Sequence, residues 1–384
     1  MNETMSSPFG SPPILPPAPQ GRVTFSGHRP DFRRLVIRGT ALELVTVGFY
    51  RFWLATDMRR HLWSNTAVDG DAAEYTGTAK ELLIGFLFAL AILAPIYLAY
   101  FLIGLEAERL KAFASIPLGL FFYLFAQFAI YRARRYRLTR TVWRGVRFWM
   151  TGSGWSYAWR AGLWGLLSLL TLGIAVPWAK AALERYKMRH TAYGSLQGRF
   201  EATGWGLFKQ VWWLWLLVWP SFFILIPLPF IYGALKAIEW RWWVSGIRMG
   251  DVSFESGLTS GALIGLYWKV IGWSVLLMVI LSAWFGGVFA IALAAVGGGE
   301  SSQQKAVLAF QQLPTLIALG VGYVVVALAA GVIIRIYLAR DVWQRVAESV
   351  TVHNLAAADD VAAQGNLVSA LGEGFADSLD VVGF

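Results

Sequence analysis

The chain has 384 residues, of which 57% are hydrophobic and only 15% are charged, and its formal net charge is +10. An average soluble domain carries about 25% charged residues, so this composition indicates that a bilayer surrounds much of the chain. The absence of cysteine excludes disulfides, thiolate catalysis and cysteine-ligated metals. The arginines stand at the ends of apolar runs rather than in one basic domain, which argues against a nucleic-acid partner.

Composition divides the chain into three parts. Residues 1–21 are rich in proline and lack the basic and apolar regions of a signal peptide, so we expect a disordered tail. Residues 22–351 are expected to form a single transmembrane domain built from repeats. Residues 352–384 are acidic and rich in glycine and alanine, which predicts a second disordered tail.

Long apolar stretches predict six full membrane spans. Pro220, Pro227 and Pro229 divide the longest stretch into two short helices that meet near Ile226, because proline breaks a helix or begins one. The expected spans are 81–105, 113–131, the two halves of 207–244, 263–285 and 316–338.

Two further apolar segments, around Gly48 and Gly173, are too short for simple crossings. About 13 residues from Leu35 to Val47 make a helix of roughly 20 Å, against an apolar bilayer core of about 30 Å. A turn at each glycine would return the chain to the side from which it came. We therefore expect two re-entrant helical hairpins, with kinked spans as the alternative.

Short β-like pieces separate the apolar segments, for example at 22–27, 146–154, 191–204 and 247–257. Basic residues flank these pieces, and the positive-inside rule places them and both termini in the cytoplasm. The expected fold class is an all-α polytopic membrane protein with short cytoplasmic β-hairpin-like pieces. We expect the pieces to pair into a small sheet, with Gly77, Gly204 and Gly257 at matching turns of positive φ.

The sequence also carries signs of an internal repeat. Around the first two apolar segments, Gly48, Trp53, Arg60 and Thr66 match Gly173, Trp178, Arg185 and Thr191 without a gap. A third window matches Gly70, Asp71, Gly77, Ile84 and Gly85 to Gly250, Asp251, Gly257, Ile264 and Gly265. A hydrophobic bias does not supply matched glycine, arginine and threonine, so the pattern favours repetition.

Three stretches together resemble a known family. They are TVGFYRFW at 46–53, RRHLWSNT at 59–66 and EYTGTAKELLIGF at 74–86. The combination is similar to the YjgN family, a bacterial inner-membrane family of unknown function, over about residues 25–350. The resemblance implies the cytoplasmic membrane of a bacterium and carries over no catalytic residue. The family often has small polar residues before its TLG turn, where this chain has Gly39 and Glu43.

No catalytic constellation stands out. The four histidines show no metal-ligand spacing, and neither a P-loop nor a G-x-S-x-G nucleophile motif occurs. We therefore expect no enzyme activity, no catalytic residue, no metal and no cofactor.

Charges inside the apolar segments are the sites of interest. A charge at the bilayer centre costs about 2.5–3.5 kcal/mol on insertion scales, so it usually faces protein or water. Glu43, Lys269 and Arg38 are the candidate residues of an intramembrane pathway, although Glu43 could equally belong to a structural buried pair with Arg38, Arg51 or Lys269. Lys236 and Glu239 are spaced to pair on one helix. Other basic and aromatic residues are expected to hold anionic lipid headgroups at the interface: Arg59, Arg60, Trp63, Arg134, Arg135, Arg185, Arg189 and Trp242.

Two functions remain open from the sequence. Repeats, broken helices and buried charges are typical of a transporter- or channel-like protein for a small solute or lipid. The alternative is a non-catalytic membrane scaffold or lipid-interacting protein. The expected partner in either case is the lipid bilayer, and homo-oligomerisation stays open.

Overall fold

The chain is built on a closed β-barrel. A computed structural model describes residues 20–106, 108–221, 227–296 and 302–365. In this part of the chain ten short antiparallel strands close in the order β1-β10-β9-β8-β7-β6-β5-β4-β3-β2. The strands are β1 (Gln20–Phe25), β2 (Thr66–Val68), β3 (Asp71–Tyr75), β4 (Thr141–Trp143), β5 (Val146–Met150), β6 (Thr191–Tyr193), β7 (Leu196–Phe200), β8 (Ile247–Met249), β9 (Val252–Ser256) and β10 (Val350–His353). The expected all-α class is therefore wrong.

Tight turns join the strands into hairpins. Asp69 and Gly70 have φ of 53° and 89°, and Arg144 and Gly145 have φ of 46° and 75°. Positive φ at both central residues defines the type I′ turn, whose twist suits an antiparallel pair. The β6–β7 and β8–β9 turns likewise place Gly194 and Gly250 at positive φ.

The expectation of positive φ at Gly77, Gly204 and Gly257 is wrong, because none of the three lies in that region. Gly77 and Gly204 allow close packing instead. A Cβ on Gly77 would lie 2.6 Å from the ring of Tyr75, and one on Gly204 would lie 2.6 Å from the Cα of Trp178.

The first and last strands close the barrel. One half of β1 pairs with β10, as in Arg22 opposite Thr351, and the other half pairs with β2, as in Phe25 opposite Thr66. The β-like pieces do pair with one another, as expected, but the product is a closed barrel rather than a small open sheet.

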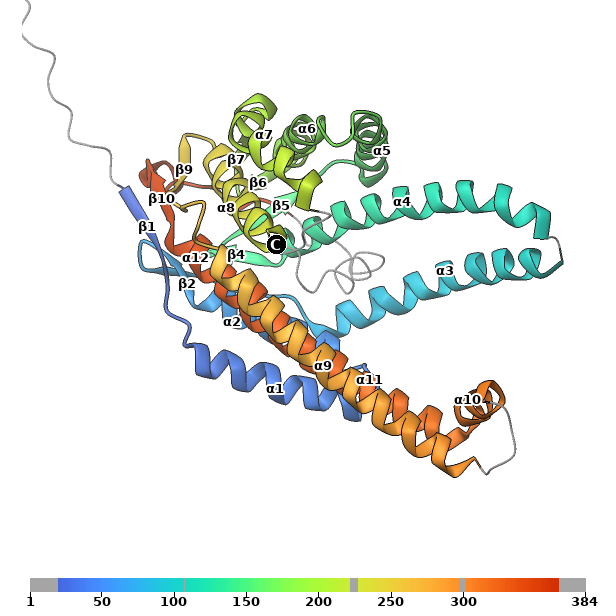
Figure 1. Ribbon diagram of the computed structural model, residues 1–384. Coiled ribbons are helices and arrows are strands. Elements are labelled where there is room, and N and C mark those ends of the chain that lie inside the picture. The colour runs from blue at the N-terminus through green and yellow to red at the C-terminus, as the bar shows by residue number, and fades with distance from the viewer. Residues whose placement is uncertain (1–19, 107, 222–226, 297–301, 366–384) are drawn as a thin grey trace, which may run out of the picture.

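Helix pairs connect the strand hairpins around the barrel (Figure 1). The first four connections are α1 (Arg29–Val45) with α2 (Arg51–Ser64), α3 (Ala79–Glu106) with α4 (Glu108–Thr139), α5 (Gly154–Leu170) with α6 (Val176–Arg189), and α7 (Gly204–Ser221) with α8 (Leu228–Gly246). The last runs through α9 (Ile264–Ala295), α10 (Ser302–Gln311), α11 (Leu313–Ile334), the π-helix η1 (Arg335–Asp341) and α12 (Val342–Glu348). A short 3₁₀ helix, η2 (Leu355–Ala358), follows β10.

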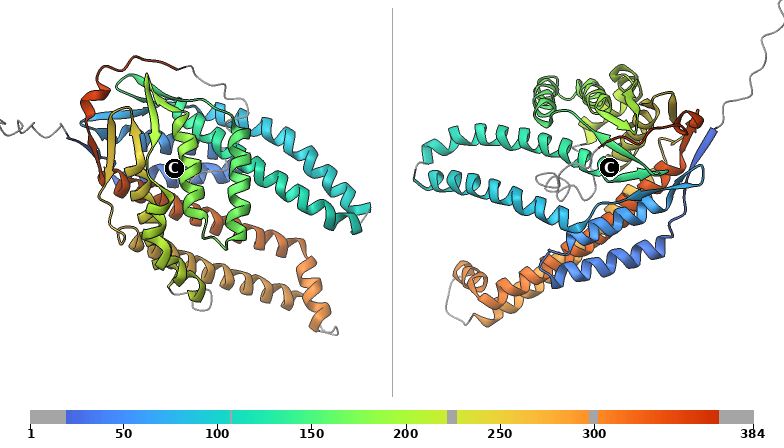
Figure 2. Two further views of the ribbon diagram at one scale, coloured as in Figure 1. Left: turned by 90° about the horizontal axis from the view of Figure 1, so that it is seen from above. Right: turned by 180° about the vertical axis from the view of Figure 1, so that it is seen from behind.

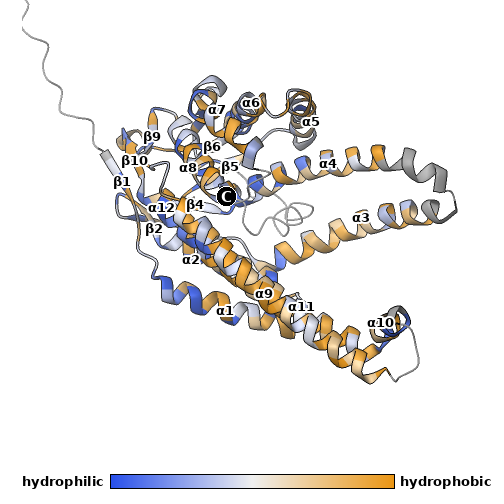
Figure 3. Cartoon of the chain, viewed as in Figure 1, coloured by the Kyte–Doolittle hydropathy of each residue, from blue (hydrophilic) through white to orange (hydrophobic). Residues whose placement is uncertain are grey.

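Four helical segments of the described chain are long and apolar enough to cross a membrane, not six. They are Ala79–Leu102, Ile116–Thr139, Ile264–Ala295 and Leu313–Glu348. Neither α7 nor α8 is among them. The two long pairs, α3–α4 and α9–α11, extend from the same side of the barrel and diverge (Figures 1 and 2). Away from the barrel, their described parts are strongly hydrophobic (Figure 3), and many of the apolar side chains there are exposed.

The segments around Gly48 and Gly173 are short helix–turn–helix pairs attached to the barrel. Both glycines have φ of 88°, and the preceding Val47 and Leu172 have φ of 51° and 50°. Each pair leaves the barrel after one strand and returns at the next, so these segments are not kinked helices of an all-α bundle. Apolar side chains at the turns are exposed, with Val47 at 88%.

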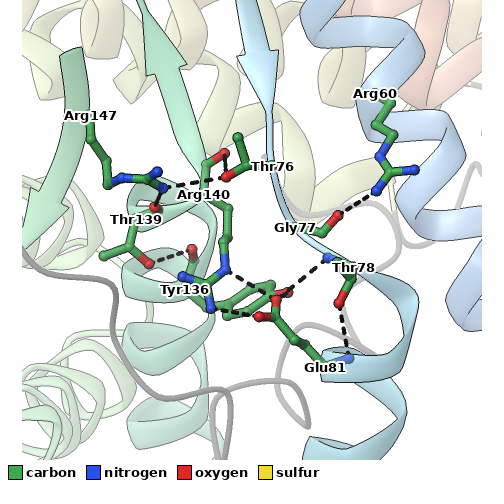
Figure 4. A network of polar contacts seen from close by, with 9 residues as sticks. All are labelled: Arg60, Thr76, Gly77, Thr78, Glu81, Tyr136, Thr139, Arg140 and Arg147. Carbon is green, nitrogen blue, oxygen red and sulfur yellow. Dashed lines mark hydrogen bonds and ion pairs between the residues drawn. The ribbon is translucent and has the colours of Figure 1, made fainter. Parts of the chain in front are cut away.

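An ion pair fixes the base of the first long helix pair (Figure 4). Arg140 donates from Nε and Nη2 to the two oxygens of Glu81, at 3.1 and 2.8 Å. The hydroxyl of Tyr136 donates to the same carboxylate at 2.7 Å, and the backbone N–H of Thr76 donates to the Arg140 carbonyl at 2.8 Å. The end of α4 is thereby locked to the start of α3. Arg60 of α2 donates to Gly77 O in the same strand-to-helix turn, and Arg340 donates to Gly27 O in the corresponding turn between β1 and α1.

Only parts of the two expected tails lie among the residues that the structure describes. Most of the tail expected at 1–21 lies outside the described residues, and β1 begins at Gln20. The segment 352–384 is described as far as residue 365, and its first part forms the end of β10 and η2.

Candidate functional site

A cavity of about 1480 Å³ occupies the interior of the barrel and the space between the adjoining helices. All ten strands of the described barrel contribute lining side chains, among them Val23, Ala73, Phe148, Met249 and Val352. Side chains alternate between the two faces of a strand, so a closed barrel of this size directs one apolar set inward and leaves room for a ligand. We call this cavity the lumen.

The lumen continues from the barrel between the bases of the helices. Most of the lining helical residues belong to the last helix of each connection, namely α2, α4, α6, α8 and α12. Pro229 and Tyr232 near the start of α8 also line it, whereas Trp242 and Trp243 line it near the end of that helix. The lumen therefore follows α8 for most of its length.

Charged side chains gather on one side of the lumen, on α4, α6 and α8. On α6, Glu184 accepts from Arg134 Nη1 at 2.8 Å and pairs with Lys187 one turn further along the helix. Each carboxylate in this part of the lumen lies between two cations, because Glu239 likewise binds Lys180 at 2.7 Å and Lys236 at 3.2 Å. We call these two groups the Glu184 triad and the Glu239 triad.

Burial and charge shift the pKa values within the Glu184 triad. Burial by itself raises the pKa of the Glu184 carboxyl, but Arg134 and Lys187 together hold that pKa at about 2. Burial lowers the pKa of Lys187, and the neighbouring Arg134 adds to the lowering, while Glu184 opposes it. The carboxylate is thus firmly ionised, whereas burial disfavours the charged form of Lys187.

The opposite side of the lumen is aromatic and apolar. Following the strand order, α2 and α12 lie across the barrel from α6. Trp63 of α2 stacks on Trp343 of α12 with ring centroids 4.9 Å apart. Their indole N–H groups donate to the hydroxyls of Thr141 and Thr66, at 3.0 and 2.8 Å, and both side chains line the lumen. The lumen is therefore amphipathic.

The segment after β10 forms part of the lumen wall. Leu355 and Ala358 of η2 are buried and line the lumen. Asp359 then accepts from Arg144 Nη1 at 2.7 Å. This ion pair ties the segment to the β4–β5 turn, across the barrel from β10 in the strand order.

Glu43 lies in a buried ion pair and not in the lumen. Both of its oxygens accept from the guanidinium of Arg335 at 2.9 Å, and the same guanidinium reaches the Thr40 hydroxyl at 3.0 Å. The Glu43 and Arg335 side chains are only 6% and 12% exposed. Arg335 was not among the partners expected for Glu43.

The other two candidate pathway residues lie elsewhere. Lys269 is exposed on α9, beside a second, smaller cavity of about 430 Å³ that Arg29 and Arg345 also line. Arg38 is exposed on α1. The structure therefore does not bring Glu43, Lys269 and Arg38 together.

The residues predicted to hold lipid headgroups divide into three sets. Trp63, Arg134 and Trp242 line the lumen. Arg59 is buried and donates to the Tyr75 hydroxyl at 3.3 Å, while Arg60 donates to a backbone carbonyl. The remaining residues, all on α4 or α6, are not lumen residues: Arg135, Arg185 and Arg189.

Sequence reasoning missed Lys180, Glu184 and Lys187, and it treated Lys236 and Glu239 as a local pair. The sequence did carry one signal for lumen residues, which is their distance along the chain from the following strand. Four residues that stand seven places before a strand line the lumen: Arg134, Glu184, Trp240 and Trp343. Within the described ranges, no group of three or more His, Asp or Glu side chains is placed to hold a metal ion.

A closed antiparallel barrel that carries long apolar helix pairs and a charged internal cavity defines the class of this protein. Its four apolar helices are compatible with a membrane location. Residues 20–239 match the model of a family described as "Bacterial protein of unknown function (DUF898)". That match covers more than half of the chain, so the protein belongs to this family, which is the YjgN family, and the resemblance is confirmed. No curated protein and no solved structure matches the chain.

Proposed function

We propose that this is a non-catalytic membrane protein of transporter-like type, whose lumen takes up a small amphipathic solute or lipid. The observation that carries the proposal is the lumen itself, a cavity of about 1480 Å³ lined by all ten strands of the described barrel and by the adjoining helices. Ligand sites are usually concave and mostly apolar, with a few convergent polar groups. A scaffold has no need of such an interior.

Two adjacent alanines of β3 offer a direct test. Ala73 lines the lumen, whereas Ala72 is exposed on the outer face of the same strand. The variant Ala73→Trp fills part of the lumen, and Ala72→Trp adds the same side chain outside it. We expect the wild type and Ala72→Trp to retain small molecules through purification, identified by mass spectrometry of the extracted protein, and Ala73→Trp to lose them.

Folding of both variants is checked by circular dichroism and gel filtration. Equal retention by both folded variants, or no retained molecule in any of the three proteins, would favour the scaffold function instead.

We further propose that the long helix pairs cross a bacterial inner membrane, with the barrel and both termini on the cytoplasmic side. The positive-inside rule supports this orientation, because basic residues gather at the barrel ends of the helices. Arg134 and Arg140 lie at that end of α4, and other helices carry basic residues in the same place. Single cysteines test it cleanly because the chain has none. An impermeant maleimide added outside should label Gln311→Cys, at the end of α10, and should not label Ser195→Cys in the β6–β7 turn.

We also infer that each helix pair with its following strand is an internal repeat. Equivalent hydrogen bonds support this inference. The first residues of β2, β4 and β6 each donate a hydroxyl to the carbonyl four residues earlier: Thr66 to Leu62, Thr141 to Arg137, and Thr191 to Lys187.

A further inference from the structure

The charges around the lumen are unequal. In the two triads, four cationic side chains line it against two carboxylates, a net charge of +2: Arg134, Lys180, Lys187 and Lys236 against Glu184 and Glu239. Charge held away from water is costly unless it is paired. An apolar cavity with this excess is therefore matched to a ligand that brings negative charge.

The two triads differ in how open they are. In the Glu184 triad the side chains of Arg134 and Lys187 are 18% and 12% exposed, so their charged groups are largely enclosed. In the Glu239 triad, Lys180 and Lys236 are 38% and 34% exposed while they line the lumen. The Glu239 triad is the more open of the two, and each of its lysines has three hydrogen-bond donors, so this triad is the better placed to bind a ligand.

The rest of the lumen fits the remainder of such a ligand. The barrel interior is lined by side chains such as Phe148, Met249 and Phe254, and the Trp63–Trp343 stack lies across the barrel from α6. A ligand with one acidic group and a long apolar body would place the acid at the Glu239 triad and the body in the barrel. A purely polar anion would leave most of this apolar surface uncovered.

We propose that the lumen ligand is an acidic amphiphile, a long-chain carboxylate or phosphate monoester, bound through Lys180 and Lys236. This inference rests on the proposed uptake of a solute into the lumen, and it adds the chemical class of that solute.

The test compares binding of labelled hexadecanoic acid with that of hexadecanol, which has the same chain and no charge. The full-length protein is placed in nanodiscs of neutral phosphatidylcholine, at a pH where the acid is ionised. We expect the acid to bind about tenfold more tightly than the alcohol or better, because a hydrogen bond to a charged group contributes at least that much. Hexadecyl phosphate in a parallel series distinguishes a phosphate monoester from a carboxylate as the preferred group.

Substitutions of the three residues in the Glu239 triad should change acid binding in opposite directions. Lys180→Met and Lys236→Met each leave Glu239 with one cation, and each should weaken acid binding about tenfold without changing alcohol binding. Glu239→Gln removes a negative charge and should tighten acid binding. A merely structural role for the triad would weaken acid and alcohol binding together in all three. Lys209→Met is the matched control, because Lys209 stacks on Trp205 of α7 and does not line the lumen.

Alcohol binding reports that the lumen of each variant is intact. If acid and alcohol bind equally, or if Glu239→Gln weakens acid binding, the acidic class is overturned while the lumen remains a binding site. If neither compound binds and Ala73→Trp also changes nothing, the proposed function fails with it.

Discussion

The ion pair between Glu43 and Arg335 makes a sharp prediction about stability. Glu43→Leu removes the carboxylate and leaves the guanidinium of Arg335 in a nearly closed site, with only the Thr40 hydroxyl as a hydrogen-bond acceptor among its contacts described above. Arg335→Met leaves the Glu43 carboxylate buried without its cation. Replacing both puts two apolar side chains of similar length face to face.

The geometry sets the expected magnitude. The pair is bidentate, with both N–O distances at 2.9 Å, and both side chains are almost fully enclosed. Removing one partner of such a pair costs about 3–5 kcal/mol, because the remaining charge stays buried without its counter-ion. Glu43→Leu should fall near the lower end, since Thr40 still accepts from Arg335. The double variant should lose far less, because apolar replacement of a buried pair is often close to neutral.

The assay is reversible unfolding in mixed micelles, followed by tryptophan fluorescence, with the four proteins compared as a double-mutant cycle. Lys269→Met is the control, since that exposed lysine makes no contact with Glu43 and should change stability by less than about 0.5 kcal/mol. The reasoning is refuted if the double variant is as unstable as the sum of the singles. It is equally refuted if Lys269→Met, rather than Arg335→Met, restores the stability of Glu43→Leu.

Three further predictions follow from the fold. Glu81→Gln should lower the free energy of unfolding by about 1–3 kcal/mol through the lost charge-assisted bonds to Arg140, whereas Glu74→Gln on the outside of β3 should not, as thermal melts will show. Gly70→Ala should cost about 1–2 kcal/mol because φ is 89° there, whereas Gly119→Ala, in the open middle of α4, should be neutral or stabilising in the same melts. Glu184 has a pKa lowered to about 2 from 4.5, so its stabilising contribution is present above pH 4.5 and is lost as pH falls toward 2. The free energy of unfolding should therefore fall more steeply with decreasing pH in the wild type than in Glu184→Gln. Equal slopes would contradict the lowered pKa of Glu184.

Local structure was largely predictable from the sequence, whereas the closure of the strands into a barrel was not. Turn signals such as Asp69-Gly70 and Gly250-Asp251 mark the β hairpins, and proline correctly divides α7 from α8. The strands, however, have only three to six residues, and β1 pairs with a strand at the other end of the domain. Nothing in so short a strand specifies a distant partner, because pairing depends on register and on packing of the whole ring. The same apolar runs therefore suggested an all-α bundle.

The candidate site was less predictable, for a related reason. Intramembrane charge drew attention to Glu43, but a charge deep in an apolar segment indicates only that a partner exists, and Arg335 comes from the far end of the chain. The charges of the lumen come from three helices, and Lys180 meets Glu239 only after the barrel has brought α6 beside α8. The spacing of lumen residues before each strand is visible in the sequence. It indicates a shared cavity only once the strands are known to close into a barrel.

The seam between β1 and β10 has a consequence for biosynthesis. Until the ribosome has delivered Val350–His353, half of β1 has no partner strand, and the barrel has an open edge at β1 and another at β9. Unpaired edges are templates for wrong pairing, and ring closure between distant segments is slow. The strands made earlier can therefore pair only into an open sheet, because the ring cannot close before β10 has been made. A chaperone or the membrane surface itself would then have to shield those two edges until translation ends.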